Sequence, residues 1–412
     1  MKTIKLDSVL LFALAIPFIM TYRISPGDTP LWLFTLIFLF LIIYLVLDLL
    51  KLKEPIYYKY KQIILWLTIF STIGAGFYSA IIVRHIVSPL YNIHDIVLQQ
   101  EAAIRFFLDG VNPYATTYFG TLLEQFHYSD TVVNPALYHF VMEPFYLLFS
   151  LPFYYVSVHT FGFFDGRIPL FLLFISTLIL AAILVKEKAK RLLFITLLAF
   201  NPAMLGYTLE GRSDIYMLGF LFPALFLLYK DKLHWGGFFM ALAFAVKQSV
   251  WPIFPLYFLY IYFKKKSLLS TFRSLSVFAA TFFVIVLPFF IWDPGAFIAS
   301  TISYLSGNTP NSYPVSGYGF GMLLHEFGFI TDLNANYPFT VWQVVFSMPL
   351  LFLMYKNFKK DPTVKKMIIF YGILLFIFWY FSRYFNNSHL GYLSTVFIIA
   401  YFWPSEDIKE GK

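Results

Sequence analysis

The sequence predicts an all-α membrane protein with about twelve membrane-spanning helices, in a range of about eleven to thirteen. Hydrophobic residues make up 59% of the 412 residues, charged residues make up 13%, and the mean hydropathy is +0.72. A soluble domain of this size would not carry so large an apolar excess. Runs such as Leu31–Leu50 and Gln62–Val83 approach or exceed the roughly 20 apolar residues that cross a bilayer. Residues 1–412 are therefore expected to form a single integral membrane domain.

The cysteine count and the charge balance narrow the function classes. The chain has no cysteine, which excludes disulfides, thiolate metal ligands and cysteine nucleophiles. Its net charge of +8 is carried by lysines in short clusters between apolar runs. Such clusters fit the head groups of membrane lipids, and nucleic acid is not an expected partner. We therefore expect a multi-pass protein of the cell membrane.

The lysine positions predict the orientation, because short cytoplasmic loops are rich in lysine and arginine. Clusters such as Lys51–Lys61 and Lys186–Arg191 are expected to be cytoplasmic, whereas loops 84–135 and 293–337 contain no lysine and are expected to face outward. On this assignment 21 of the 22 lysines are inside, and only Lys247 is not. Twelve segments then cross the membrane, with both termini inside: 6–22, 31–50, 62–83, 168–185, 192–209, 215–229, 235–249, 251–263, 275–292, 338–355, 367–382 and 388–403.

Residues 136–156 are long enough for one further crossing. That crossing would place Lys186–Arg191 outside, against the charge rule. Pro144 and Pro152 lie within the run and would kink a helix there. We therefore expect a bent, re-entrant or interfacial segment, and an ordinary thirteenth span is the alternative.

The first large outer loop, 84–135, is expected to contain an amphipathic helix at the membrane surface. Residues 98–109 have helical periodicity that turns an apolar face, including Ile104 and Phe107, towards the bilayer. Glu101, Arg105 and Asp109 follow one another at intervals of four residues, so they would share one polar face and pair there. Gly110 and the Asn112-Pro113 turn end the helix.

This helix would hold the His94-Asp95 pair at its upstream edge. A carboxylate at an apolar interface loses solvation, which raises its pKa towards the range where it can accept a proton. Asp95 is therefore a candidate general base. The alternative is that Asp95 only caps the helix or lies solvated in the loop.

Three other polar features fall within or between apolar runs. The segment Glu210–Asp214 is a tight turn with two carboxylates and the guanidinium of Arg212, and its alternative reading is an ordinary ion-paired turn. Lys247 lies inside an apolar run, at a cost of about 2.5–3.5 kcal/mol, so it needs an anionic partner. That partner is either a structural carboxylate such as Asp214 or the phosphate of a lipid ligand. Arg383, between the last two spans, offers a planar fork that matches phosphate oxygens.

The second large outer loop, 293–337, carries side chains of the kinds that bind sugars: Asn308, Asn311, Tyr313 and Tyr318. Amides donate and accept hydrogen bonds with hydroxyl groups, and aromatic faces pack on sugar rings. This signal is weak alone. The chain contains no phosphate-binding loop, nucleophile elbow, HExxH or dinucleotide-binding fingerprint.

Taken in order, these residues resemble the GT-C glycosyltransferase superfamily, and most closely its polyprenol-phosphate-mannose-dependent, DUF2029-like branch. The resemblance covers about residues 62–263 and rests on the order of several short motifs. Asn134 and Ala136 depart from the family pattern, and two spans precede the usual first one. The motifs are Asp95 followed by a helix that ends in Gly110–Tyr114, then Asn134–Leu137, Asn201-Pro202, Gly211–Asp214, and Lys247 with Pro252 and Pro255.

The resemblance implies inverting transfer of a sugar from a polyprenyl-phosphate donor to an acceptor hydroxyl on the extracytoplasmic face. The sugar is expected to be a hexose such as mannose, and the acceptor a lipid, a glycan or a protein. Asp95 would be the general base. No cofactor is certain, and a divalent metal such as Mg or Mn is possible. The implied donor-phosphate ligands are Arg212, Lys247 and Arg383, and the residues implied to position the acceptor or a metal are His94, Glu101, Glu210 and Asp214.

Two alternatives from other classes remain open. A secondary transporter would explain twelve spans, an intramembrane lysine and broken helices equally well. Against it, the halves show no inverted repeat, and the polar residues gather in loops on one side instead of at the midplane. A non-catalytic assembly protein would predict that Asp95 is dispensable.

Overall fold

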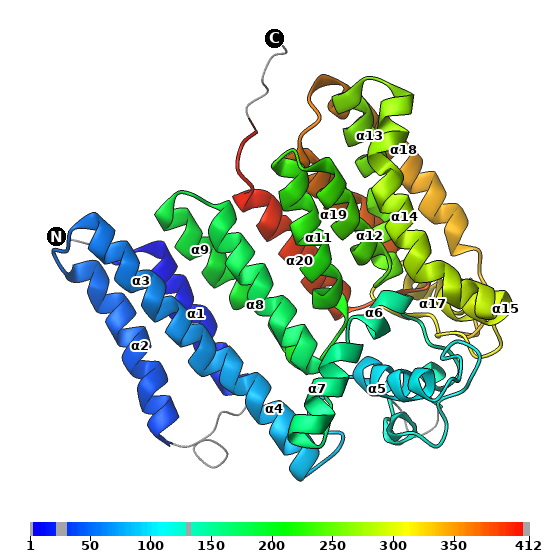
Figure 1. Ribbon diagram of the computed structural model, residues 1–412, viewed down its shortest axis with the longest axis horizontal. Helices are drawn as coiled ribbons and strands as arrows, with labels where there is room; N and C mark the ends of the chain where they lie inside the picture. Colours follow the sequence, from blue (N-terminus) through cyan, green and yellow to red (C-terminus); the bar gives the residue numbers. More distant parts are fainter. Residues whose placement is uncertain (1–2, 22–30, 129–132, 407–412) are drawn as a thin grey trace.

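The computed structural model describes residues 3–21, 31–128 and 133–406, and these form helices almost throughout (Figure 1). The predicted all-α class is confirmed. Five helices are long and apolar enough to cross a membrane, which is the pattern of a membrane protein. They are α2 (Leu31–Leu49), the continuous helix Glu54–Ile86, α8 (Arg167–Leu184), α14 (Leu268–Trp292) and α18 (Phe339–Lys360).

Each of the other predicted spans also contains a helix, but these helices are shorter. The number of crossings therefore stays a prediction. The shorter helices are α1 (Leu6–Thr21), α9 (Lys188–Ala199), α10 (Leu205–Leu209), α11 (Asp214–Tyr229), α12 (Leu233–Phe244), α13 (Phe254–Lys265), α19 (Val364–Tyr380) and α20 (Asn387–Phe402).

The continuous helix Glu54–Ile86 consists of α3 (Glu54–Ile69), a π-helical turn η1 (Phe70–Gly74) and α4 (Ala75–Ile86). α3 packs on α2 and α9 at one edge of the bundle (Figure 1). Lys61 of α3 is fully buried there, with Nζ 2.6 Å from an oxygen of Asp7 and 2.9 Å from one of Asp48. Lys61 therefore lies within a helix, and two carboxylates from α1 and α2 neutralise it inside the bundle.

The centre of the bundle is built around α11, which packs on both α8 and α12. Most of its residues are buried, as expected for a helix that is apolar all round. α12 approaches closely because Gly236 has no side chain: a Cβ there would lie 2.7 Å from the Leu228 side chain. This contact holds the two helices together near the turn that joins them, and Asp214 and Lys247 lie towards the opposite ends of the pair.

Residues 136–156 do not form the single long helix that a thirteenth crossing would need. They contain a 3₁₀ turn η3 (Pro135–Leu137) and α6 (Pro144–Leu148), and α7 (Leu151–Phe161) begins within them. Both α6 and α7 have a proline in their first turn, Pro144 and Pro152, where the missing N–H of proline costs no hydrogen bond. The backbone N–H groups of Glu143 and Phe145 donate to Val246 and Ala245, so the bent segment docks on the end of α12.

The predicted amphipathic helix is α5, which begins at Asp95 and ends at Leu108. It lies inside the protein and not at the membrane surface. Residues 95–104 are all buried, and Ile104 is fully buried instead of facing lipid. The Glu101, Arg105 and Asp109 pairing was also wrong, because Glu101 pairs with Arg84 and the other two are exposed. The amphipathic pattern arose because the polar side chains of α5 bond to other segments of the protein instead of to water.

The two large loops lie at the same end of the bundle, which we call the loop end (Figure 1). A hydrogen bond of 3.3 Å from Ser300 Oγ to the Tyr114 carbonyl joins them. Residues 293–337 form a small apolar core together with Phe339, the first residue of α18, and Val315 is fully packed in it. The elements of the loop end are η2 (Leu122–Gln125), α15 (Pro294–Ile298), η5 (Ala299–Ser303), α16 (Tyr304–Ser306), β1 (Ser316–Gly317) and α17 (Phe320–Glu326), and β1 pairs in parallel with β2 (Tyr384–Phe385).

Candidate active site

A cavity of about 820 Å³ opens at the loop end, and it brings together side chains from segments that are far apart in the sequence. Six of the eight predicted site residues line it, and the other two, Glu101 and Glu210, do not. The six are His94, Asp95, Arg212, Asp214, Lys247 and Arg383.

Asp95 occupies the first position of α5, with His94 as the N-cap. Its Oδ1 lies 2.7 Å from His94 Nδ1, and Asn134 Nδ2 donates to Oδ2 at 3.3 Å. Burial raises the pKa of Asp95, but His94 and the hydrogen bonds to the carboxylate lower it more, so the pKa lies below its ordinary value. The expected increase was wrong. Asp95 is ionised at neutral pH and can accept a proton without first losing one.

His94 links Asp95 to Tyr128, a residue that sequence reasoning missed. Tyr128 Oη lies 3.2 Å from His94 Nε2, while His94 Nδ1 faces Asp95. The Ile96 N–H also lies 3.3 Å from Nδ1, a contact that requires the other tautomer. The contact to the Asp95 carboxylate is shorter and charge-assisted, so it places the proton on Nδ1 and leaves Nε2 to accept from Tyr128.

On another part of the cavity wall, Lys247 pairs with Asp214. Lys247 Nζ lies 2.7 Å from Asp214 Oδ1; the Asp214 side chain is 2% exposed and that of Lys247 is 20% exposed. Asp214 begins α11, and Lys247 immediately precedes η4 (Gln248–Ile253). Of the two partners expected for Lys247, the structural carboxylate is the one found. The partial exposure of the ammonium group still leaves it accessible from the cavity.

Arg212 is the cation least committed to protein groups. Its guanidinium lies over the Tyr207 ring at 4.5 Å, and Nη1 donates to Ser388 Oγ at 3.3 Å. Nε is 3.5 Å from Glu210 Oε2, too far and too poorly aligned to count as a hydrogen bond, and it has no other partner among the described residues. Arg212 is therefore the best placed of the three predicted cations to bind an anion.

Arg383 does not fit its predicted role as a phosphate ligand. Its Nε donates to the Tyr313 carbonyl, Nη1 to Ala335 at 2.7 Å, and Nη2 to Leu333 at 3.2 Å and Asn334 at 3.0 Å. Four backbone carbonyls thus occupy the guanidinium, which is almost fully buried. Arg383 borders the cavity but holds residues 313–335 in place.

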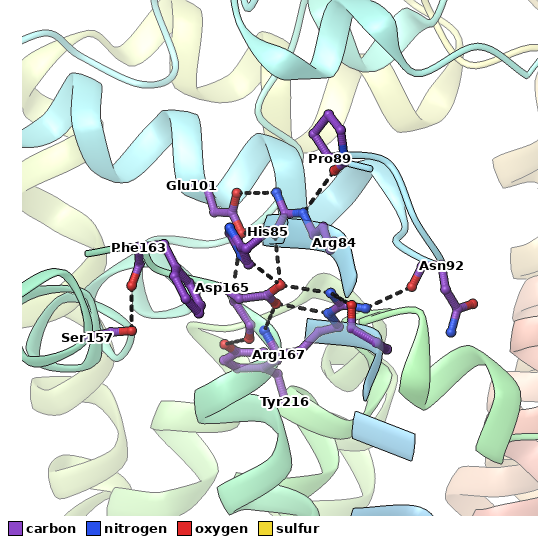
Figure 2. A network of polar contacts seen from close by, with 12 residues as sticks. Arg84, His85, Pro89, Asn92, Glu101, Ser157, Phe163, Asp165, Arg167 and Tyr216 are labelled. Atoms are coloured by element: carbon purple, nitrogen blue, oxygen red, sulfur yellow. Dashed lines mark hydrogen bonds and ion pairs between the residues drawn. The ribbon is translucent and has the colours of Figure 1, made fainter. Parts of the chain in front are cut away.

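The two predicted residues outside the cavity wall have structural roles. Glu101 forms a bidentate ion pair with Arg84, with both contacts at 2.6 Å, within a buried network (Figure 2). Glu210 contributes its backbone: its carbonyl accepts the His94 N–H at 2.7 Å, and its side chain is 33% exposed. Neither side chain positions an acceptor in this geometry.

The expected divalent metal finds no obvious ligand set. Within residues 3–21, 31–128 and 133–406, no group of three or more histidine, aspartate or glutamate side chains is arranged to hold a metal ion. Asp95 and Asp214 are each already paired with a neighbouring base, His94 and Lys247.

Glu143 is a second residue that sequence reasoning missed, and it lies directly behind the cavity wall. It is fully buried, and Oε1 accepts from Gln248 Nε2 at 3.0 Å. Burial raises the pKa of Glu143 to about 8, so the group is protonated at neutral pH. A glutamate inside the apolar run 136–156 is itself a signal, because ionisable residues are rare in such runs.

The remaining cavity wall is largely apolar. α18 contributes one face with helical spacing, including Val344, Met348 and Leu351. α19 adds Leu374 and Phe378, and the residues around η4 add an indole ring and two prolines. The wall can accommodate a hydrocarbon chain next to charged groups.

The arrangement thus combines three chemical capacities: an ionised carboxylate, two cationic side chains and an apolar surface. A carboxylate can take a proton from a hydroxyl group, and cations can stabilise a phosphate. Comparisons of the chain with protein families, with curated proteins and with solved structures found no match.

Proposed function

We propose that this protein is an integral membrane glycosyltransferase that moves a hexose from a polyprenyl-phosphate donor to an acceptor hydroxyl. One observation carries the proposal: the ionised carboxylate of Asp95 shares a partly apolar cavity with Arg212 and Lys247. A lipid-phosphate sugar has a hydrocarbon chain, an anion and an anomeric carbon, and the cavity offers a surface or group for each. The resemblance of the motif order to the GT-C superfamily supports the same activity.

In the proposed reaction, Asp95 takes the proton of the acceptor hydroxyl as its oxygen attacks the anomeric carbon. The bond between that carbon and the phosphate oxygen breaks, so the configuration inverts and the lipid phosphate leaves with one more negative charge. Arg212 and Lys247 would stabilise this growing charge. The His94 contact would hold the carboxylate in the orientation needed to accept the proton.

We further propose that this chemistry takes place on the extracytoplasmic face of the cell membrane. The cavity is lined by Asp95 and Tyr128 from one lysine-free loop and by Tyr313 from the other. Loops without lysine favour the outward side. A donor embedded in the membrane would reach the site along the apolar wall.

Transfer of label from polyprenyl-phosphate sugars tests the proposal. Purified protein in lipid vesicles would be given donors labelled in mannose or glucose, together with a lipid extract as the source of acceptors. Asp95→Asn keeps the size of the side chain but cannot take a proton, so turnover should fall by about 10²–10⁴-fold. Asp109→Asn is the matched control, because Asp109 is exposed at the far end of α5 and does not line the cavity.

The proposal fails if wild-type protein transfers no label from any donor, or if Asp95→Asn retains wild-type turnover. A second candidate function is secondary transport, which is favoured by the Lys247–Asp214 pair where the chain breaks between α12 and η4. The same vesicles separate the two functions. A transporter moves the labelled compound across the bilayer unchanged, whereas a transferase converts it into a new labelled product.

A further inference from the structure

A buried ion network lies where α4 ends and α8 begins, next to the cavity but outside its wall (Figure 2). Arg167 is fully buried and pairs with both oxygens of Asp165, through Nε at 2.9 Å and Nη2 at 2.8 Å. Arg84 contacts the same Asp165 at 2.9 Å and holds Glu101 of α5 in a bidentate pair. The network therefore ties three helices together through charged groups with little access to water.

The same two arginines also bond to the loop that leads into Asp95. Arg84 Nε donates to the Pro89 carbonyl at 3.0 Å, and Arg167 Nη1 donates to the Asn92 carbonyl at 2.8 Å. Asn92 has a φ of 45°, a left-handed conformation that asparagine tolerates better than most residues. With the bond from the His94 N–H to Glu210, the loop is fixed at three points just before the carboxylate.

α5 itself is held on three sides by consecutive residues. Gln99 donates to the Ala136 and His139 carbonyls, Gln100 donates to Ser150 Oγ, and Glu101 binds Arg84. Successive side chains of an α-helix point about 100° apart. Three such anchors prevent the helix from rotating about its axis, and the loop before it holds the first turn, where Asp95 lies.

Arg167 also contacts the turn that carries Arg212. Gly211 has a φ of 91°, and a Cβ there would lie 2.3 Å from the Val97 side chain and 3.0 Å from Arg167 Cγ. The turn therefore packs directly against both α5 and the stem of Arg167. The Arg167 side chain therefore contacts both the loop before Asp95 and the turn before Arg212.

We propose that Arg167 is a positioning residue that sets the place of Asp95 relative to Arg212, through Asn92 on one side and Gly211 on the other. The inference rests on the proposed function of the cavity. Arg167 does not line the cavity and would touch neither donor nor acceptor. Its loss should therefore lower kcat and leave the KM for the donor nearly unchanged.

A spin label on the loop tests the proposal without requiring activity. The chain has no cysteine, and Tyr91 is 42% exposed, so Tyr91→Cys gives a single labelling site between the two bonded carbonyls. Arg167→Lys keeps the charge but cannot bind both Asp165 oxygens and Asn92 at once. We expect a sharper, more mobile EPR spectrum in Arg167→Lys, and a fall in kcat of about 100-fold with a donor KM within about twofold.

Lys61→Met is the control, because it removes an equally buried cation from a different helix, Glu54–Ile86, at the end of that helix away from Arg84. It should leave the label immobile. An immobile label in Arg167→Lys, or equal mobility in both variants, would overturn the inference. If wild-type protein shows no transfer activity, the proposed function fails, but the EPR comparison still decides whether Arg167 holds the loop. If Arg167→Lys does not fold, Arg84→Lys is measured in its place. Arg84 bonds to the Pro89 carbonyl of the same loop, so its replacement should also give a more mobile spin label.

Discussion

Replacing Lys247 with methionine removes the positive member of a nearly buried ion pair and leaves the Asp214 carboxylate alone. The two charges lie 2.7 Å apart, and Asp214 is 2% exposed, so water replaces the lost partner only poorly. Breaking a buried pair typically costs about 3–5 kcal/mol. Because Lys247 is 20% exposed, part of its charge is already screened, and we expect a cost near about 3 kcal/mol.

The double variant Lys247→Met/Asp214→Asn tests whether the loss of stability comes from the unpaired Asp214 carboxylate. Neutralising the stranded carboxylate should make the double variant more stable than Lys247→Met alone, so the two substitutions are not additive. Unfolding of the purified protein in lipid, followed by tryptophan fluorescence, measures the effect. The exposed pair Lys190–Glu187 provides the control, and Lys190→Met should leave the unfolding transition where it is.

An unchanged transition in Lys247→Met would refute the structural role of this pair. If the same variant also lost donor affinity by about ten- to a hundredfold, Lys247 would serve chiefly as a phosphate ligand. Additive effects in the double variant would refute the direct coupling to Asp214.

Three further predictions concern Glu143, Arg383 and the membrane topology. The pKa of Glu143 is raised to about 8, so its contribution to stability is full below pH of about 4.5 and is lost as the pH rises through about 8. Melting temperatures between pH 5 and about 9 should therefore fall in wild-type protein and vary less in Glu143→Gln. Arg383→Lys loses most of its four carbonyl contacts, so limited proteolysis should cut within residues 313–335 faster while the bundle stays folded. A cysteine at exposed Asn311 should react with an impermeant thiol reagent from outside, and one at Lys186 should not; the reverse result would invert the proposed orientation.

The choice of Asp95, Arg212 and Lys247 as site candidates could be made from the sequence, because each interrupts an apolar run or follows one in a polar segment; their convergence on one cavity is seen only in the fold. The direction of the Asp95 pKa shift could not be predicted. It depends on the His94 side chain and on Asn134, which lies 39 residues away. Desolvation alone gives the opposite sign.

The burial of α5 could not be predicted from the sequence either, because its bonding partners come from distant segments. Gln99, Gln100 and Glu101 are residue types that usually face water, yet they bond to backbone carbonyls, a serine hydroxyl and Arg84. The partners of Arg383 could not be predicted either, since they are backbone carbonyls, which every residue type has. Sequence patterns show which side chains need partners, and only the fold shows which partners they have.

The continuous helix Glu54–Ile86 has a consequence for the bilayer itself. It carries one buried cation near each end, Lys61 and Arg84, and the residues between them rise about 35 Å at about 1.5 Å per residue. That length is close to the roughly 30 Å thickness of the hydrocarbon layer. Both cations are held by protein carboxylates and cannot extend towards the head groups, as free lysines and arginines do. We therefore expect the protein to accommodate a thinner bilayer by tilting this helix instead of by moving its charged side chains, and to select membranes by thickness.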